Sequence, residues 1–195
     1  RSGKMAASDA LVHASRQLLS TGAETTAKFE WIVVMGGFFA FLAAFGIGAN
    51  DVANAFATSV GSGALTIKHA VMLAAVFEFC GALFMGGHVV KTIRKGIANQ
   101  DCFKDDPGLL MYGCLCVIFS VAIWLVVASF LEMPVSTTHS CVGGMIGMTM
   151  VARGSSCVVW SAKSDTFPYI KGVAAIVVSW LLSPIVSGGF SFVFF

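Results

Sequence analysis

The sequence predicts an all-α membrane protein with about five transmembrane or re-entrant helical elements, and three observations support this prediction. Of the 195 residues, 57% are apolar and only 11% are charged, whereas roughly 25% of residues are charged in soluble domains. Long apolar windows recur, each long enough for a helix across about 30 Å of hydrocarbon. The net charge of +2 gives no electrostatic footprint for nucleic acid. A soluble globular enzyme and a nucleic-acid-binding protein are therefore excluded.

Residues 1–30 precede the first apolar window and are too hydrophilic to enter a membrane. They carry four bases and three acids among small polar residues, and we interpret them as an extramembrane tail. Asp9, Glu24 and Glu30 argue against a transit peptide, because such peptides are poor in acids. The missing initiator Met and the final residues SFVFF are expected of a piece of a longer protein. Residues 31–195 then form the transmembrane domain.

Apolar windows mark the helical elements in order. Four windows contain no charge, and one further stretch contains a single carboxylate, Glu78. The expected elements cover residues 31–50, 69–90, 107–131, 133–152 and 172–195. Short polar connections are expected at residues 58–68, 91–106 and 153–171.

The cysteines and the bases give two further expectations. The six cysteines include no CxxC pair, and four lie in apolar runs, where a free Cys acts as a small hydrophobe, so we expect no disulfide framework and no metal site. If the first two spans both cross, the tail and the connection 91–106 share a side that holds eight bases, against Lys68 opposite. The positive-inside rule then places the amino terminus in the cytoplasm.

The segment GIGANDVANAFATS, residues 46–59, carries polar groups at membrane depth. At helical spacing Asn50, Asn54 and Thr58 share one face, and Asp51 lies about 100° round from them. Small residues surround these groups and permit close helix packing. Carboxylate and amide oxygens are ligands for a hard cation. The alternative is structural, with Asn50 or Asp51 as the N-cap of a helix over residues 52–67.

Glu78 is a second polar group at membrane depth. Its neighbours one turn away are Ala or Gly, so the carboxylate is expected to face protein rather than lipid. We interpret Glu78 as part of the site, and the alternatives are an ion pair with a base elsewhere or a protonated side chain.

The segment EMPVSTTHSCVGGMIG, residues 132–147, predicts an anion site at a helix start. Pro134 suits a first helical turn, and the hydroxyls of Ser136, Thr137, Thr138 and Ser140 follow it. The glycines that follow suit a re-entrant hairpin better than a smooth span. The alternative is an ordinary N-cap before a lipid-exposed helix. His139 is expected to be a structural hydrogen-bond donor rather than a ligand.

Taken together, these segments resemble the inorganic phosphate transporter family, the sodium-dependent phosphate symporters related to a fungal phosphate permease. The resemblance rests on GANDVANAFATSVGSGALT (48–66), the stretch around Glu78, KTIRKG (91–96) and PVSTTHS (134–140). It implies two inverted repeats whose phosphate and sodium sites meet near the midplane, a construction that transporter physics also favours. Family members carry a second GAND motif, and this sequence has one. The resemblance thus implies one half of an inverted-repeat transporter, its first repeat, with a missing second repeat or a homodimer partner.

The resemblance also implies the site residues. Asp51, Glu78 and Ser136 are expected to matter for transport, with Asn50, Asn54, Thr137 and Thr138 as motif neighbours. Phosphate is expected to bind at Ser136, Thr137, Thr138, Asp51 and Asn54. Sodium is expected at Asn50, Asp51 and Glu78, with Asn54 as a further cation-binding position. Animal members of the family are thought to keep the amino terminus outside, opposite to the base count, so orientation stays open.

The expected function is secondary active transport of inorganic phosphate by symport with sodium, in a multi-pass protein of the plasma membrane. No cofactor beyond the coupling ion is expected. The nearest alternative is a proton-coupled phosphate permease or a sulfate permease of the same fold. A passive channel or a structural subunit would need no cation-binding carboxylates. An enzyme is not expected: a hydrolase using Ser136, His139 and Asp51 would lack an oxyanion hole and a GxSxG elbow.

Overall fold

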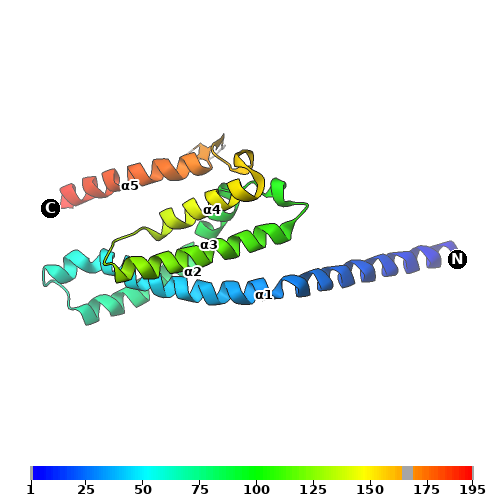
Figure 1. The fold of residues 1–195 in the computed structure, drawn as a ribbon, viewed down its shortest axis with the longest axis horizontal. Helices are drawn as coiled ribbons and strands as arrows, with labels where there is room; N and C mark the ends of the chain where they lie inside the picture. Colours follow the sequence, from blue (N-terminus) through cyan, green and yellow to red (C-terminus); the bar gives the residue numbers. More distant parts are fainter. Residues whose placement is uncertain (1, 164–168, 195) are drawn as a thin grey trace.

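The computed structural model describes residues 2–163 and 169–194, and for residues 2–26 and Lys95 it describes only the backbone. Helices make up most of this part of the chain (Figure 1), as the all-α prediction requires. In order they are α1 (Ser2–Gly61), α2 (Ile67–Gly96), α3 (Pro107–Phe130), α4 (Thr137–Arg153) and α5 (Val173–Phe194). The connections hold two short 3₁₀ helices, η1 (Gln100–Phe103) and η2 (Ser155–Cys157), and a small antiparallel sheet of β1 (Ala162–Lys163) and β2 (Ile170–Lys171).

Four helices in the described residues are long and apolar enough to cross a membrane. They are Ala27–Gly61 within α1, Ile67–Arg94 within α2, and the whole of α3 and α5. Most of their large apolar side chains are exposed, which suits contact with lipid or with further membrane helices. Helix α4 has only 17 residues. Each of the five predicted windows therefore contains a helix, and the fourth helix is the short one.

Helix α1 is continuous through the GAND segment. It extends to Gly61, so the alternative of a new helix starting at residue 52 with Asn50 or Asp51 as its N-cap is wrong. Because α1 continues past residue 58, the connection to α2 shortens to residues 62–66, and Thr66 caps α2 by accepting from the His69 N–H. The backbone of residues 2–30 is part of the same helix, and the side chains of residues 2–26 of the predicted tail lie outside the described residues.

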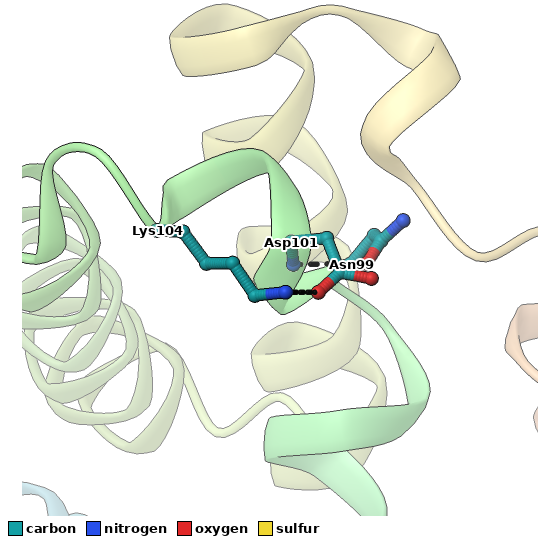
Figure 2. A network of polar contacts seen from close by, with 3 residues as sticks. All are labelled: Asn99, Asp101 and Lys104. Atoms are coloured by element: carbon teal, nitrogen blue, oxygen red, sulfur yellow. Dashed lines mark hydrogen bonds and ion pairs between the residues drawn. The ribbon is translucent and has the colours of Figure 1, made fainter.

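Helix α2 is also longer than predicted and ends at Gly96 rather than at residue 90. The charges that follow residue 90 end the apolar window without ending the helix, because Lys and Arg are good helix formers. In the connection after it, Asn99 caps η1 by accepting from the Asp101 N–H at 3.0 Å, and Lys104 pairs with Asp101 at 2.6 Å (Figure 2). Both charged side chains are exposed, so the pair contributes little to stability.

Helices α1 and α3 pack closely and run parallel. Gly36 of α1 faces Leu115, which a Cβ at Gly36 would meet at 3.9 Å, and Gly46 faces Leu125, so both helices advance by the same number of residues. A Cβ on Gly46 would lie 2.8 Å from the Leu125 Cβ. Small residues allow such close approach between membrane helices. Helix α4 returns alongside α3, where a Cβ on Gly144 would lie 3.0 Å from the Val117 side chain. The buried core lies between these two helices and extends to the connections around Phe103 and Val158 and to the start of α5.

The turn between α3 and α4 has defined geometry at both ends. Glu132 has a positive φ of 55°, its N–H donates to the Ser129 carbonyl, and the Met133 N–H donates to the Ala128 carbonyl at 2.9 Å. These bonds form a Schellman motif that ends α3. Helix α4 begins at Thr137 with Ser136 as its N-cap. Pro134 therefore precedes the first helical turn, contrary to the prediction, because the hydroxyl of Ser136 rather than the proline ring determines the start.

A disulfide joins Cys102 and Cys157, so the expectation that no disulfide forms is wrong. These two cysteines are the ones outside the apolar runs, in connections separated by 55 residues. The Asn99 N–H donates to the Cys157 carbonyl, and the Val159 N–H donates to the Ile97 carbonyl at 2.8 Å. We call residues 97–103 and 155–160 the disulfide junction. The sequence could not reveal it, because the α3–α4 hairpin brings the two connections together.

Candidate ion and anion site

The amide of Asn50 links α1 to the α3–α4 turn. Its Nδ2 donates to the Met133 carbonyl at 2.9 Å, and its Oδ1 accepts from the Val135 N–H at 3.1 Å. The same Oδ1 accepts from Asn54 Nδ2 at 3.1 Å. Asn50 is only 5% exposed. Both lone pairs of its oxygen are thus engaged, and the residue acts as a clamp between two segments far apart in the sequence.

Asp51 lies beside the start of α4. The Thr137 hydroxyl donates to Asp51 Oδ2 at 2.8 Å, and both residues are half-buried. A carboxylate near the amino end of a helix is stabilised by the helix dipole. Asp51 Oδ1 and the remaining lone pairs of Oδ2 make no hydrogen bond within the described residues. Carboxylate oxygens of this kind are suited to a hard cation.

Asn54 and Thr58 extend the polar face of α1 away from the turn. The Asn54–Asn50 hydrogen bond confirms that positions four residues apart share a face, as the spacing predicted. Asn54 is exposed, and its Oδ1 accepts no hydrogen bond in the described part of the chain. Thr58 is exposed one turn further on.

The start of α4 divides its hydroxyls between different tasks. Ser136 Oγ accepts from the His139 N–H at 3.3 Å, so the N-cap alternative describes this residue correctly. The Ser140 hydroxyl donates to the Ser136 carbonyl, and Thr137 is engaged with Asp51. Thr138 is exposed, and in the described chain its hydroxyl has no partner. The backbone N–H groups of a first helical turn also lack intrahelical acceptors. Hydrogen-bond donors for an anion therefore remain at this helix start.

His139 contacts the residues at this helix start. Its Nδ1 lies 2.6 Å from Ser136 Oγ. Its ring stacks on Trp180 of α5, with ring centroids 3.7 Å apart and an interplanar angle of 22°. Trp180 could not be recognised from the sequence, because a tryptophan inside an apolar window is typical of any membrane helix.

Glu78 is not brought to this cluster. It is exposed on α2 and makes no hydrogen bond or ion pair within the described residues. The part of the chain that the structure describes contains no group of three or more His, Cys, Asp or Glu residues that could hold a metal ion. The cluster thus unites Asn50, Asp51 and Asn54 with residues 133–140, and Glu78 stands apart from it.

The GAND segment and the PVSTTHS segment are the two motifs that the structure brings together. Their contacts join residues separated by 83 to 86 positions. One side of the contact offers carboxylate and amide oxygens, and the other offers hydroxyl and backbone N–H donors. An arrangement of this kind can place a cation and an anion next to each other.

Comparison with known proteins gives a consistent result. Residues 47–195 match the phosphate transporter family. The chain is 48% identical over 154 residues to the chloroplastic inorganic phosphate transporter 2-1 of Arabidopsis thaliana, covering 79% of this chain and 24% of that protein. It is 40% identical over 180 residues to the mouse sodium-dependent phosphate transporter 1, covering 91% of this chain and 25% of the relative. The phosphate-repressible phosphate permease pho-4 of Neurospora crassa is 39% identical over 168 residues, which cover 86% of this chain and 28% of the permease.

The chain therefore spans about a quarter of the length of these curated relatives. No solved structure matches it at a significant level. The family match covers most of the chain, includes both motifs of the cluster and agrees with helices that can cross a membrane. This chain is an integral membrane protein and belongs to the phosphate transporter family.

Proposed function

We propose that this chain is the first repeat of an inverted-repeat transporter that carries inorganic phosphate across the plasma membrane together with sodium. The observation that supports the proposal best is the hydrogen bond between Thr137 and Asp51, 2.8 Å apart. It joins the helix start that we propose for the anion to the carboxylate that we propose for the cation. The names of the mouse and rat relatives, sodium-dependent phosphate transporter 1, support sodium as the coupling ion.

The depth of the cluster supports transport rather than surface binding. Asn50 precedes the end of α1 at Gly61 by eleven residues, which corresponds to about 17 Å of helix. If that end lies at a membrane surface, the cluster is close to the middle of a hydrocarbon layer about 30 Å thick. Transporters with inverted repeats place their substrate sites at this depth, where two repeats meet.

The anion in this proposal binds at the start of α4. Thr138 and Ser136 supply hydroxyls, and the first turn supplies free N–H groups at the positive end of the helix dipole. Thr137 joins them only if its hydroxyl proton moves from Asp51 to the anion. Phosphate so placed is close to Asp51 and, through Asn54, to the polar face of α1. The helix start thus gives the anion several donors but also a neighbouring negative charge.

That negative charge is the source of coupling. Phosphate and the Asp51 carboxylate repel each other unless a cation binds between them. In our proposal sodium binds to Asp51 and Asn54, and Glu78 contributes from the surface of α2 that faces the second repeat. Asn50 joins the ligand set only if its oxygen exchanges one of its two hydrogen bonds. Two sodium ions with one monovalent phosphate carry a net charge of +1, which gains roughly 2.3 kcal/mol per 100 mV of inside-negative potential.

Uptake of radiolabelled phosphate into liposomes tests this function. The full-length transporter that contains this chain is reconstituted, and a sodium gradient, a proton gradient and a potassium gradient are imposed separately. We expect accumulation above equilibrium with the sodium gradient alone, and little competition from excess sulfate. Accumulation driven by protons, or competition by sulfate, would identify the alternative permease. Equilibration without accumulation would identify a passive channel.

A further inference from the structure

The ring of His139 lies between the proposed anion site and helix α5. On one side its Nδ1 is 2.6 Å from Ser136 Oγ, and on the other its face stacks on Trp180 at 3.7 Å between centroids. Ser136 Oγ also accepts from the His139 backbone N–H. The Ser136 hydroxyl oxygen is thus in contact with both the backbone N–H and the ring Nδ1 of His139.

The direction of the Ser136 proton depends on the ring. If Nδ1 carries a proton, it donates to Ser136 Oγ, which then accepts two hydrogen bonds, and the hydroxyl proton is free to point outward. If Nδ1 lacks a proton, the hydroxyl donates back to the ring and offers nothing to an anion. A hydroxyl that is to bind phosphate must donate, because phosphate oxygens are acceptors. Phosphate binding at Ser136 therefore requires the first arrangement.

Trp180 fixes the plane of this ring. Trp180 and Ile176 of α5 are packed against the buried core of the molecule, so the indole has a fixed position relative to α4. Stacked rings lose rotational freedom, and aromatic pairs of this kind contribute beyond the area that they bury. With the ring plane fixed by Trp180, Nδ1 stays directed at Ser136.

We propose that His139 and Trp180 are positioning residues of the anion site. Trp180 orients the His139 ring, the ring donates from Nδ1 to Ser136 Oγ, and the Ser136 hydroxyl proton is thereby presented to phosphate. The proposal rests on the proposed function, because it assumes that phosphate binds at the start of α4. It assigns to α5 a role in substrate affinity even though α5 contributes no ligand.

Substitutions at His139 separate the hydrogen bond from the stacking. His139→Phe keeps an aromatic ring and loses the donor, whereas His139→Asn places an amide N–H at the position of Nδ1. In liposomes containing the full-length transporter, His139→Phe should raise the half-saturating phosphate concentration about tenfold. His139→Asn should restore most of the affinity, and the half-saturating sodium concentration at saturating phosphate should change little in both variants.

A double-mutant cycle shows whether His139 acts through Ser136. In a Ser136→Ala background the hydroxyl is absent, so His139→Phe should add less than about a twofold further change. If His139→Phe has its full effect in that background, the ring does not act through the hydroxyl and the proposal is wrong. If Ser136→Ala alone leaves phosphate affinity unchanged, Ser136 binds no phosphate and the positioning role is wrong. If Thr138→Val also leaves it unchanged, the proposed anion site itself is wrong, which distinguishes the two failures.

Substitutions at Trp180 test the role of α5. Trp180→Leu should raise the half-saturating phosphate concentration several-fold, and Trp180→Phe, which keeps a ring, should restore it. Trp124→Leu is a matched control, because Trp124 is a partly exposed tryptophan of α3 that has no ring partner among the described residues. An equal effect of Trp124→Leu and Trp180→Leu would overturn the positioning role of Trp180.

Discussion

Asn50 shows how one side chain determines the geometry of the cluster. Its amide donates to the Met133 carbonyl and accepts from the Val135 N–H. Both backbone groups belong to the non-helical turn between α3 and α4. Unpaired backbone groups at membrane depth cost several kcal/mol each. Non-helical backbone is tolerated there only where protein or water satisfies it. The sequence indicated Asn50 as a cation ligand, and its role as a clamp depends on partners more than 80 residues away.

At the start of α4, substitutions of Thr138 and Ser136 are expected to affect phosphate binding alike but stability differently. Thr138 has an unpaired hydroxyl in the described chain, whereas Ser136 also caps the helix. Thr138→Val should therefore raise the half-saturating phosphate concentration roughly tenfold, as for a lost hydrogen bond to an anion. Ser136→Ala should do the same and also cost about 1 kcal/mol of stability. Uptake kinetics and thermal unfolding measure the two effects. Unchanged phosphate dependence in both variants would exclude an anion at this helix start.

Asp51 allows its charge to be removed while its hydrogen bond is kept. In Asp51→Asn the side-chain oxygen can still accept from the Thr137 hydroxyl, so folding and membrane insertion should persist. Sodium-driven phosphate uptake by the full-length transporter should collapse, because the amide attracts a cation far less than the carboxylate does. Thr137→Val is the control that loses the hydrogen bond and keeps the charge. Normal sodium dependence in Asp51→Asn would show that the carboxylate only supports the helix start.

Glu132 occupies a backbone conformation that favours glycine. Its φ of 55° lies in the left-handed region at the end of α3, which costs a non-glycine residue about 1 to 2 kcal/mol. Glu132→Gly should thus stabilise the purified chain by about 1 kcal/mol in thermal unfolding. Leu131, with φ −87°, gains nothing from glycine, so Leu131→Gly is the matched control. Equal effects of the two substitutions would contradict this account of the turn.

At the scale of elements, the contact between α1 and α3 depends on one glycine. A Cβ on Gly46 would lie 2.8 Å from the Cβ of Leu125, which is fully buried, whereas nothing lies within 4 Å of a Cβ on Gly48. Gly46→Ala must separate the helices and should cost about 1 to 3 kcal/mol. Gly48→Ala meets open space and should be neutral or slightly stabilising, because Ala is the better helix former. Thermal unfolding of the purified chain compares them, and equal losses would refute the packing.

The sequence predicted elements well where their ends carry local signals. Helix α3 was expected over residues 107–131 and is found at Pro107–Phe130, because Asp106 caps it and Pro107 suits the first position. Helix α2 exceeds its apolar window, because charges end a hydrophobic stretch but not a helix. The sequence predicts the start of α4 too early, because Pro134 and Ser136 are both plausible start signals. Only the tertiary contact of Asn50 with the Val135 N–H distinguishes them. The Asn50 clamp and the His139–Trp180 stack depend entirely on tertiary contacts.

For the whole molecule, the helix directions place both connections of the disulfide junction on one side. Helices α1 and α3 run parallel, and α2 and α4 return, so the turn at residues 62–66 lies on the opposite side. Disulfides persist in oxidising compartments. The bases near the junction would place this side in the cytoplasm. The disulfide is the stronger indication of orientation, because charges elsewhere in a longer protein can reverse an orientation set by bases.

Thiol labelling of intact cells tests this orientation. We expect that a membrane-impermeant reductant opens the bond between Cys102 and Cys157, after which an impermeant maleimide labels both thiols. In Cys102→Ser the single thiol of Cys157 should react without reductant, and the protein should lose about 2 to 4 kcal/mol of stability. The other cysteines lie within α2, α3 and α4, which limits background labelling. Labelling that requires permeabilised cells would place the junction and the start of the first membrane span in the cytoplasm, as the base count predicts.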